Sequence, residues 1–326
     1  MYVVNKCPIC DSAEYLTIPA MIPDFIQKYV LKSKQHICEF CICNHCQLRF
    51  FKNRYNDKEL ERLYSNYRGE AYFQARRRYE PWYTKKLNDS NLSSEVIERR
   101  KHLLEEYLRT HTDLSQLNIV VDFGGDRGQF IPKSVGTQKY LLDVSQVSPV
   151  EGVTSIAELS DIGSSVDLII CAHVLEHIPD MYQMLCDLVG SDGFTDRTLL
   201  YIEVPAEQWE ISNFLKTTFY EKNLKTLTSW SVTRIVWDFF SIVARAMFNK
   251  VMFFNVIKIH EHINFYNEKS LIELAAKCNL DVIHLGHDHS KNISTQDGNI
   301  RLLAKKKNTM QTTSDNESSA GKTKAE

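Results

Sequence analysis

Six of the nine cysteines lie before residue 47, and their spacing is typical of a metal site. Four of them form two C-x-x-C pairs, Cys7-Pro-Ile-Cys10 and Cys43-Asn-His-Cys46. Each pair can place two thiolates on one tetrahedral ion, and two pairs complete a four-sulfur zinc site with no open coordination position. A closed site of this kind stabilises a fold, so we predict a structural zinc ion.

A third C-x-x-C pair, Cys38 and Cys41, competes with the second pair for the metal. We favour Cys43 and Cys46 because the run QLRFF follows them directly and can form the strand that ends a zinc ribbon. In a reducing compartment such crowding of thiols favours a metal over disulfides. Reduced cysteines without a metal are the alternative.

A glycine cluster follows an apolar, strand-like run and predicts a cofactor loop. Glycine is scarce, at 12 residues, yet Gly124, Gly125 and Gly128 fall within five positions. Such a loop lets the backbone approach a ligand closely, and a helix after it would aim N-terminal N–H groups at that ligand. Asp143 ends the next strand-like run, 21 residues beyond Asp122, where a carboxylate can bind both hydroxyls of a ribose. These residues leave a nicotinamide cofactor and S-adenosylmethionine both open.

The segment His260-Glu261-His262 groups three side chains that can accept or donate a proton. Histidine is the side chain whose ordinary pKa lies nearest to neutral pH, which suits a general base. If the segment is extended, His260 and His262 share one face and Glu261 points to the other. The alternative is that these residues only cap the helix predicted after them.

The elements that must position these residues alternate between strands and helices from about residue 118 to residue 305. Six strand-length apolar runs carry the pattern of a sheet that is covered on both faces. These runs are NIVVDF, KYLLDV, VDLIICA, TLLYIEV, LDVIHLG and NIRLLAK. The pattern predicts an α/β fold with a doubly wound, Rossmann-like sheet.

Composition shifts divide the chain into four predicted sections. We expect a zinc-ribbon module at 1–55, a helical connector at 56–112, the α/β domain at 113–305 and a disordered tail at 306–326. An insertion at 206–258 interrupts the α/β alternation. Its part from 229 to 258 is rich in aromatic residues and free of Gly and Pro, which predicts one or two amphipathic helices. We expect a lid packed on the domain, with contact to a membrane, a lipid-linked substrate or a second subunit as the alternative.

The charge balance argues against a nucleic-acid partner. Lys and Arg total 39 against 41 Asp and Glu, which gives a formal net charge of −2. No global basic field therefore attracts phosphate backbones. The N-terminal residues lack the basic and apolar regions of a signal peptide, and no run is apolar enough to span a bilayer. We expect a cytoplasmic protein.

The succession VDFGGDRGQF, LLDVS, SVDLIICAHVLEHIPD and LLYIEVP resembles the motifs of class I S-adenosylmethionine-dependent methyltransferases. The resemblance covers about residues 118–305 and implies a seven-stranded sheet with S-adenosylmethionine as the cofactor. It implies that the loop from Asp122 through Phe123 to Gly128 wraps the methionine part and that Asp143 holds the ribose. Ala172 and His173, at the end of the fourth strand, would lie beside the methyl group.

One residue departs from the pattern of that family. The loop usually contains D-x-G-x-G-x-G, and this chain has Asp126 where the middle glycine belongs. A strained or intruding side chain there would weaken cofactor binding. A cofactor-less scaffold protein is therefore an alternative to an enzyme.

The two C-x-x-C pairs restrict the resemblance to a smaller group of methyltransferases. Together with the segment LYSNYRGEAY, the EVP after the fifth strand and HEH-x-x-F-Y, they resemble deoxysugar C-methyltransferases and related bacterial glycan methyltransferases. This resemblance implies that Glu261 and His262 act on a sugar and that Tyr67 and Tyr72 lie near cofactor and sugar. It implies methylation of a nucleotide-activated sugar or a glycan, at carbon or at oxygen. RNA and other small molecules are the alternative substrates.

Overall fold

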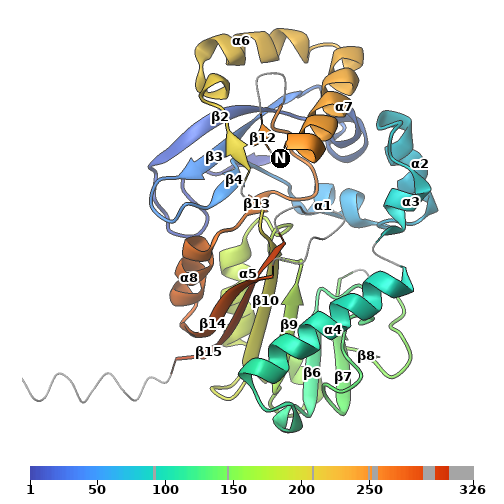
Figure 1. The fold of residues 1–326 in the computed structure, drawn as a ribbon, viewed down its shortest axis with the longest axis vertical. Coiled ribbons are helices and arrows are strands. Elements are labelled where there is room, and N and C mark those ends of the chain that lie inside the picture. Colours follow the sequence, from blue (N-terminus) through green and yellow to red (C-terminus); the bar gives the residue numbers. More distant parts are fainter. Residues whose placement is uncertain are drawn as a thin grey trace, which may run out of the picture.

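The computed structural model describes residues 1–90, 93–144, 147–207, 209–248, 250–251, 256–288 and 298–307, and the side chains of these residues except 244–251. The tail predicted to be disordered lies outside the described residues from 308 onward. Figure 1 shows the α/β sheet in the lower half, with the N-terminal residues and two helices of the insertion above it.

A seven-stranded sheet forms the lower half and confirms the predicted α/β class. Its order is β14-β15-β10-β9-β6-β7-β8, with all neighbours parallel except β15, which is antiparallel to both β10 and β14. The strands are β6 (Ile119–Phe123), β7 (Gln138–Leu142), β8 (Thr154–Ser155), β9 (Leu168–Ala172), β10 (Leu199–Pro205), β14 (Leu280–Asp288) and β15 (Asn299–Lys306). Six of them fall on the predicted apolar runs, and β8 is the seventh.

Helices cover both faces of this sheet unequally. Helix α4 (Ser94–His111) buries Leu104 and Leu108 in one apolar cluster with Val120 of β6. Helices α5 (Met181–Gly190) and α8 (Glu268–Lys277) pack in a second cluster, which contains Val121 and so lies on the opposite face. Successive residues of β6 thus point to opposite covered faces, which explains its unbroken apolar sequence.

The helix predicted after the glycine cluster is absent, and that prediction was wrong. All residues between β6 and β7 are described, and they form turns and bends. Helix formation is disfavoured there because the short connection contains four glycines and Pro132. Between β8 and β9 the chain forms only a short 3-10 helix, Leu159–Ile162.

A four-stranded antiparallel sheet forms the upper half, in the order β13-β4-β3-β2. Three of its strands come from the N-terminal section: β2 (Tyr15–Met21), β3 (Ile37–Cys43) and β4 (Arg49–Phe51). The fourth, β13 (Asn264–Phe265), directly follows the His260-Glu261-His262 segment and pairs with β4. This pairing fixes the candidate base segment to the N-terminal module.

The connector and the insertion complete the upper half. The first part of the connector forms α1 (Asp57–Tyr64), α2 (Glu70–Tyr79) and α3 (Lys85–Asn88), whereas its last part is α4, which lies on the sheet of the lower half. The insertion forms α6 (Thr218–Leu227) and α7 (Ser231–Phe248). One apolar cluster includes Phe40 of β3, Tyr72 of α2, Leu224 of α6 and Ile263. Among the described residues, no helix is both long and apolar enough to cross a membrane.

Candidate active site

The four cysteines of the favoured pairs lie together. The Sγ atoms of Cys7 and Cys46 are 3.5 Å apart, and those of Cys10 and Cys43 are 3.4 Å apart. The four Sγ atoms all lie within 4.8 Å of one another. Four thiolates grouped in this way fit a tetrahedral zinc ion.

The competing pair, Cys38 and Cys41, is not part of this group. Cys38 is buried in the apolar cluster of the upper half, and the Cys41 thiol lies 3.8 Å from the Thr17 hydroxyl. The group of four instead packs on α8, where Lys277 Nζ donates a hydrogen bond of 2.7 Å to the carbonyl of Ile9.

The glycine cluster forms a tight loop around a buried carboxylate. A Cβ on Gly125 would lie 2.0 Å from Asp122 Oδ2, and one on Gly124, whose φ is +70°, would lie 2.6 Å from the Val174 side chain. Asp122 Oδ2 is buried and accepts no hydrogen bond from the described residues. Burial raises the pKa of Asp122 to about 7, and the nearby Asp143 carboxylate adds to this effect.

Asp126 occupies its place in the loop with φ +59°, in the left-handed region that glycine prefers. Its backbone N–H donates to Asp143 Oδ2 at 2.9 Å, and its carboxylate accepts from Gln129 at 3.2 Å. Three carboxylates, those of Asp122, Asp126 and Asp143, thus converge at the ends of β6 and β7. An orphaned buried oxygen in an anionic loop fits a cationic ligand, and S-adenosylmethionine carries a sulfonium and an ammonium group.

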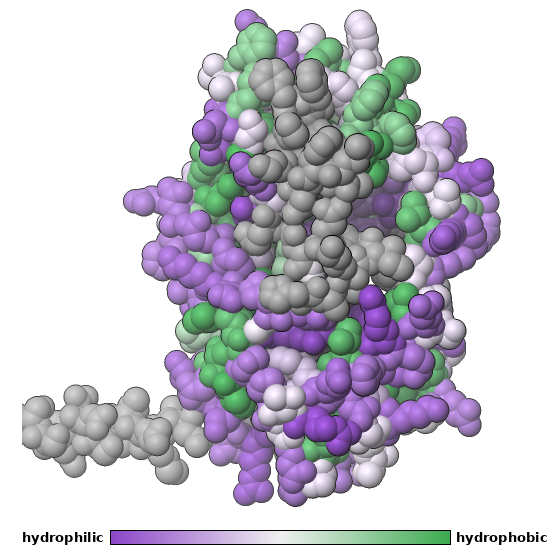
Figure 2. All heavy atoms as spheres, viewed as in Figure 1, coloured by the Kyte–Doolittle hydropathy of each residue, from purple (hydrophilic) through white to green (hydrophobic). Residues whose placement is uncertain are grey.

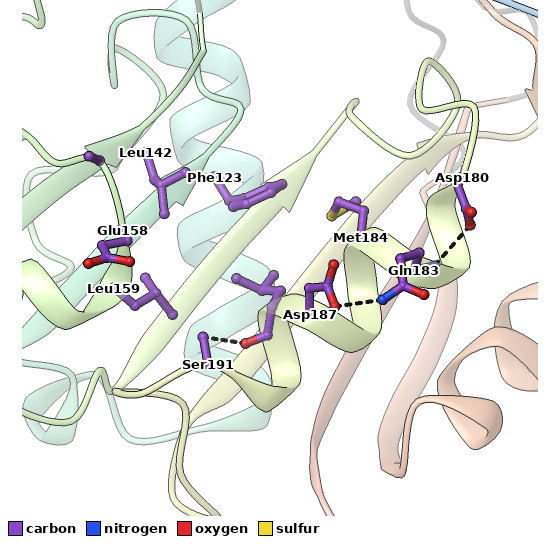
Figure 3. Close-up of a pocket in the computed structure, with 11 residues that line it drawn as sticks. Phe123, Leu142, Glu158, Leu159, Asp180, Gln183, Met184, Asp187 and Ser191 are labelled. Atoms are coloured by element: carbon purple, nitrogen blue, oxygen red, sulfur yellow. Dashed lines mark hydrogen bonds between the residues drawn. The ribbon is translucent and has the colours of Figure 1, made fainter. Parts of the chain in front are cut away.

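An apolar groove of about 440 Å³ begins beside this loop. Phe123 points from the end of β6 toward Met184 of α5, and Leu142 and Leu159 line the other side (Figure 3). The 3-10 helix between β8 and β9 contributes Leu159 to this lining.

Arg100 also belongs to this region, although the sequence does not single it out. It lies on α4 with its guanidinium 3.8 Å from the centre of the Phe130 ring. Its charge lowers the pKa of Asp122 against the effect of burial. Nothing in the sequence distinguishes Arg100 from the other charged residues of this helix, because the helix is predicted from the spacing of its apolar residues.

His173 follows Ala172 at the end of β9 and is held by two carboxylates. Its backbone has φ +59°, and its ring nitrogens lie 3.0 Å from Glu203 Oε1 and 3.3 Å from Glu176 Oε1. Burial lowers the pKa of His173, but these carboxylates outweigh burial and raise it. Glu203 is fixed in turn by Arg301, whose Nε donates at 2.9 Å.

The segment His260-Glu261-His262 contains bends, so the alternation of an extended strand does not hold. His260 and Glu261 both contact α2 and the residue after it. His260 Nε2 lies 2.9 Å from Glu80 Oε1, and Glu261 accepts hydrogen bonds from the Tyr72 hydroxyl and from Arg76 Nη1, the latter at 2.8 Å.

This network determines the chemistry of Glu261. Burial raises its pKa, but Arg76 and His260 outweigh burial and hold the pKa of Glu261 well below its ordinary value. A carboxylate so strongly stabilised is a poor proton acceptor. Arg76 belongs to the run Arg76-Arg77-Arg78, and it is committed to ion pairs with Glu80 and Glu261.

His262 points the other way, toward the sheet. Its Nδ1 lies 2.8 Å from Glu207 Oε2, and its ring centre lies 4.8 Å from that of His177. Burial lowers the pKa of His262, but Glu207 outweighs burial and raises it to about 9. Glu207 is not among the residues predicted from the sequence, because it lies in the segment 206–258, which is predicted as a whole to form the lid.

A line of polar side chains joins the cofactor loop to this histidine. Glu176 is buried, with Oε1 3.3 Å from His173 Nδ1 and 3.9 Å from His177 Nε2. His177 Nδ1 lies 3.1 Å from the carbonyl oxygen of Glu261. The rings of Tyr64, Tyr67 and Tyr72 contact one another beside this line, with centres 5.2 to 5.3 Å apart.

A protein-family profile described as a methyltransferase domain matches residues 94–285, which is more than half of the chain. The chain therefore belongs to this family of methyltransferase domains, as its resemblance to S-adenosylmethionine-dependent methyltransferases implied.

Solved structures of low sequence identity are similar to parts of the chain. An S-adenosylmethionine-dependent methyltransferase from Clostridium acetobutylicum is 10% identical with a TM-score of 0.39, over 68% of this chain and 96% of that one. The 1,6-didemethyltoxoflavin-N1-methyltransferase of Burkholderia thailandensis is 13% identical with a TM-score of 0.40, over 68% and 82%. LepI, solved with S-adenosylmethionine, is 16% identical with a TM-score of 0.33, and the match spans 63% of this chain but only 46% of LepI. A search of curated proteins finds no match.

Proposed function

We propose that the chain is an S-adenosylmethionine-dependent methyltransferase that acts on a hydroxyl group, or on the carbon next to a keto group, of a nucleotide-activated sugar or a glycan. The line His173–Glu176–His177 leads from the cofactor loop to His262 and carries this proposal. A base at His262 would face the methyl group of a cofactor bound at the glycine loop, as an in-line transfer requires.

The cofactor would supply a methyl group bound to a positively charged sulfur. Asp122 and the loop to Gly128 would hold the methionine part, with Arg100 as the group that binds its carboxylate. Asp143 would hold the ribose, and the groove beside Phe123 would take the adenine ring. Ala172 and His173 would lie next to the methyl group.

The acceptor would lie between His262 and the tyrosine rings. Aromatic ring faces suit the C–H face of a sugar ring, and the resemblance to deoxysugar and glycan methyltransferases supports that substrate class. We assign proton removal to His262 alone. His260 and Glu261 hold the segment against α2, because their side chains already contact Glu80 and Arg76.

A structural zinc ion on Cys7, Cys10, Cys43 and Cys46 belongs to the same proposal. So does the division into a zinc-ribbon module (1–55), a connector (56–112) and a methyltransferase domain (113–305) with a lid (206–258). Hydrophobic side chains reach the surface beside α6 and α7, at the top of Figure 2, and Trp230 and Phe240 are among the exposed ones. This face supports contact between residues 229–258 and a membrane or a lipid-linked acceptor.

Calorimetric titration with S-adenosylmethionine and S-adenosylhomocysteine tests the proposal first. Micromolar binding to the zinc-loaded protein supports it and shows that Asp126 is tolerated. A folded chain that binds neither compound contradicts it and favours a scaffold role.

Replacement of the candidate base tests the chemical step. His262→Ala should abolish turnover of an acceptor found by screening activated sugars, while the affinity for S-adenosylhomocysteine stays within about twofold. Retained turnover would remove the assignment of His262 as the base.

A further inference from the structure

We infer that Glu207 is a positioning residue for the methyl transfer, which holds His262 through Nδ1 so that Nε2 faces the acceptor. This inference rests on the proposed function and adds a residue to its machinery. Glu207 lies two positions after β10, and His262 lies two positions before β13, so the two side chains come from separate elements.

The geometry is that of an oriented imidazole. Glu207 Oε2 lies 2.8 Å from His262 Nδ1, and the side chains are 24% and 29% exposed. Among the described residues, Nε2 of His262 has no hydrogen-bond partner. A carboxylate on one ring nitrogen fixes the tautomer and leaves the other nitrogen to accept a proton.

Four charged or titratable groups face His262 from the elements packed around it. Glu207 comes from the chain after β10, Glu176 and His177 come from the turn after β9, and Glu261 is its neighbour in sequence. Glu261 is already bound by Arg76 and Tyr72. Glu176 approaches His173 and His177, and Glu207 is the carboxylate at hydrogen-bonding distance from the His262 ring, so Glu207 is the group that orients it.

The pairing also makes His262 a stronger base than an ordinary histidine, since Glu207 raises its pKa to about 9. The neutral ring that can accept a proton at Nε2 therefore becomes the main form only as the pH approaches that value, and the transfer should speed up over the same range. In the transfer, the acceptor loses its proton to Nε2, and its freed electron pair forms the bond to the methyl carbon. The electrons of the broken carbon–sulfur bond stay on sulfur. The resulting imidazolium is stabilised by Glu207 until it releases the proton to water.

The pKa of His262 tests the pairing without any acceptor. We expect NMR titration of the full, zinc-loaded chain to give a value near 9, and the Glu207→Gln variant to give a value about two units lower, closer to that of an ordinary histidine. Glu207→Asp should retain part of the shift. Glu221→Gln, an exposed acid of α6 in the same insertion, is the matched control and should leave the pKa of His262 unchanged.

Chemical modification gives a second measure that a purely structural role would not change. Diethylpyrocarbonate reacts with neutral imidazole, so mass spectrometry at pH 7 should show His262 modified roughly tenfold faster or more in Glu207→Gln. Binding of S-adenosylhomocysteine should stay within about twofold in every variant, which shows that the fold is intact.

The possible outcomes separate the two proposals. An unchanged pKa and unchanged reactivity of His262 in Glu207→Gln overturn the role of Glu207, whatever the cofactor titration gives. A lowered pKa together with cofactor binding supports it. Absence of cofactor binding in every variant, including the unmodified chain, overturns the methyltransferase function itself and the role of Glu207 with it.

Discussion

The two ends of the proposed active site are built in opposite ways. The three carboxylates of the cofactor end come from a short continuous stretch, from β6 to the residue after β7, and the buried Asp122 oxygen has no hydrogen-bond partner in the described residues. The acceptor end is assembled from α2, the chain after β9, Glu207 and the segment before β13, and the carboxylate of Glu261 is bound by Arg76 and Tyr72. The first end leaves a buried carboxylate oxygen of Asp122 that a ligand could engage, whereas in the second the side chain of Glu261 is already held by Arg76 and Tyr72.

The largest expected effect comes from removing the metal that would brace the acceptor end. Cys46→Ser should abolish zinc binding and destabilise the protein by about 5 kcal/mol or more, because binding of structural zinc is coupled to folding. Elemental analysis and thermal unfolding measure both effects. Cys41→Ser is the control and should keep one zinc per chain, and equal zinc loss in the two variants would contradict the assignment of the four ligands.

Arg76→Met should have the next largest effect, since it leaves the buried carboxylate of Glu80 and the largely buried carboxylate of Glu261 without their partner. We expect a loss of about 3–5 kcal/mol in the free energy of unfolding, measured by urea denaturation. The adjacent and exposed Arg77 supplies the control, and Arg77→Met should change stability by less than about 0.5 kcal/mol. If the two variants are equally stable, the acceptor end is not held by this network.

Gly125→Ala probes the cofactor end, because its Cβ would lie 2.0 Å from Asp122 Oδ2 and must displace that carboxylate. We expect affinity for S-adenosylhomocysteine to fall roughly tenfold, about 1.4 kcal/mol, by calorimetry. Gly190→Ala at the end of α5 meets no atom within 4 Å and should leave affinity unchanged. Equal affinity in both variants would show that the loop does not touch the ligand.

The smallest effect is the pH dependence that Asp122 gives to cofactor binding. Its pKa is raised by burial to about 7, so its contribution to stability is fully present below about pH 4 and is lost as the pH rises to about 7. A cationic ligand favours the ionised carboxylate, so affinity should rise severalfold from pH 6 to pH 8. The Asp122→Asn variant should lose this increase, and an identical pH profile in both proteins would exclude Asp122 from the site.

The difference between the cofactor end and the acceptor end also explains which features could be predicted from the sequence. The strands and the loop at Gly124–Gly128 were predictable because apolar runs and glycine spacing are local signals. The predicted helix after the loop failed because the strand-loop pattern implied it while Pro132 and the glycines disfavoured it. The pair Glu207–His262 could not be found from spacing, since it joins residues 55 positions apart. The contacts of Glu261 could not be predicted either. A sequence motif identifies which residues are present, but it does not show which side chains of a distant helix will contact them.

The pairing of β4 with β13 has a consequence for synthesis of the chain. Roughly 210 residues separate the two strands, so at about 5–20 residues per second β4 remains an unpaired sheet edge for about 10–40 s after it is made. Unpaired edges template aggregation. A ribosome-bound or truncated chain that ends before Asn264 should therefore depend on chaperones, even though its first three strands are already able to pair with one another.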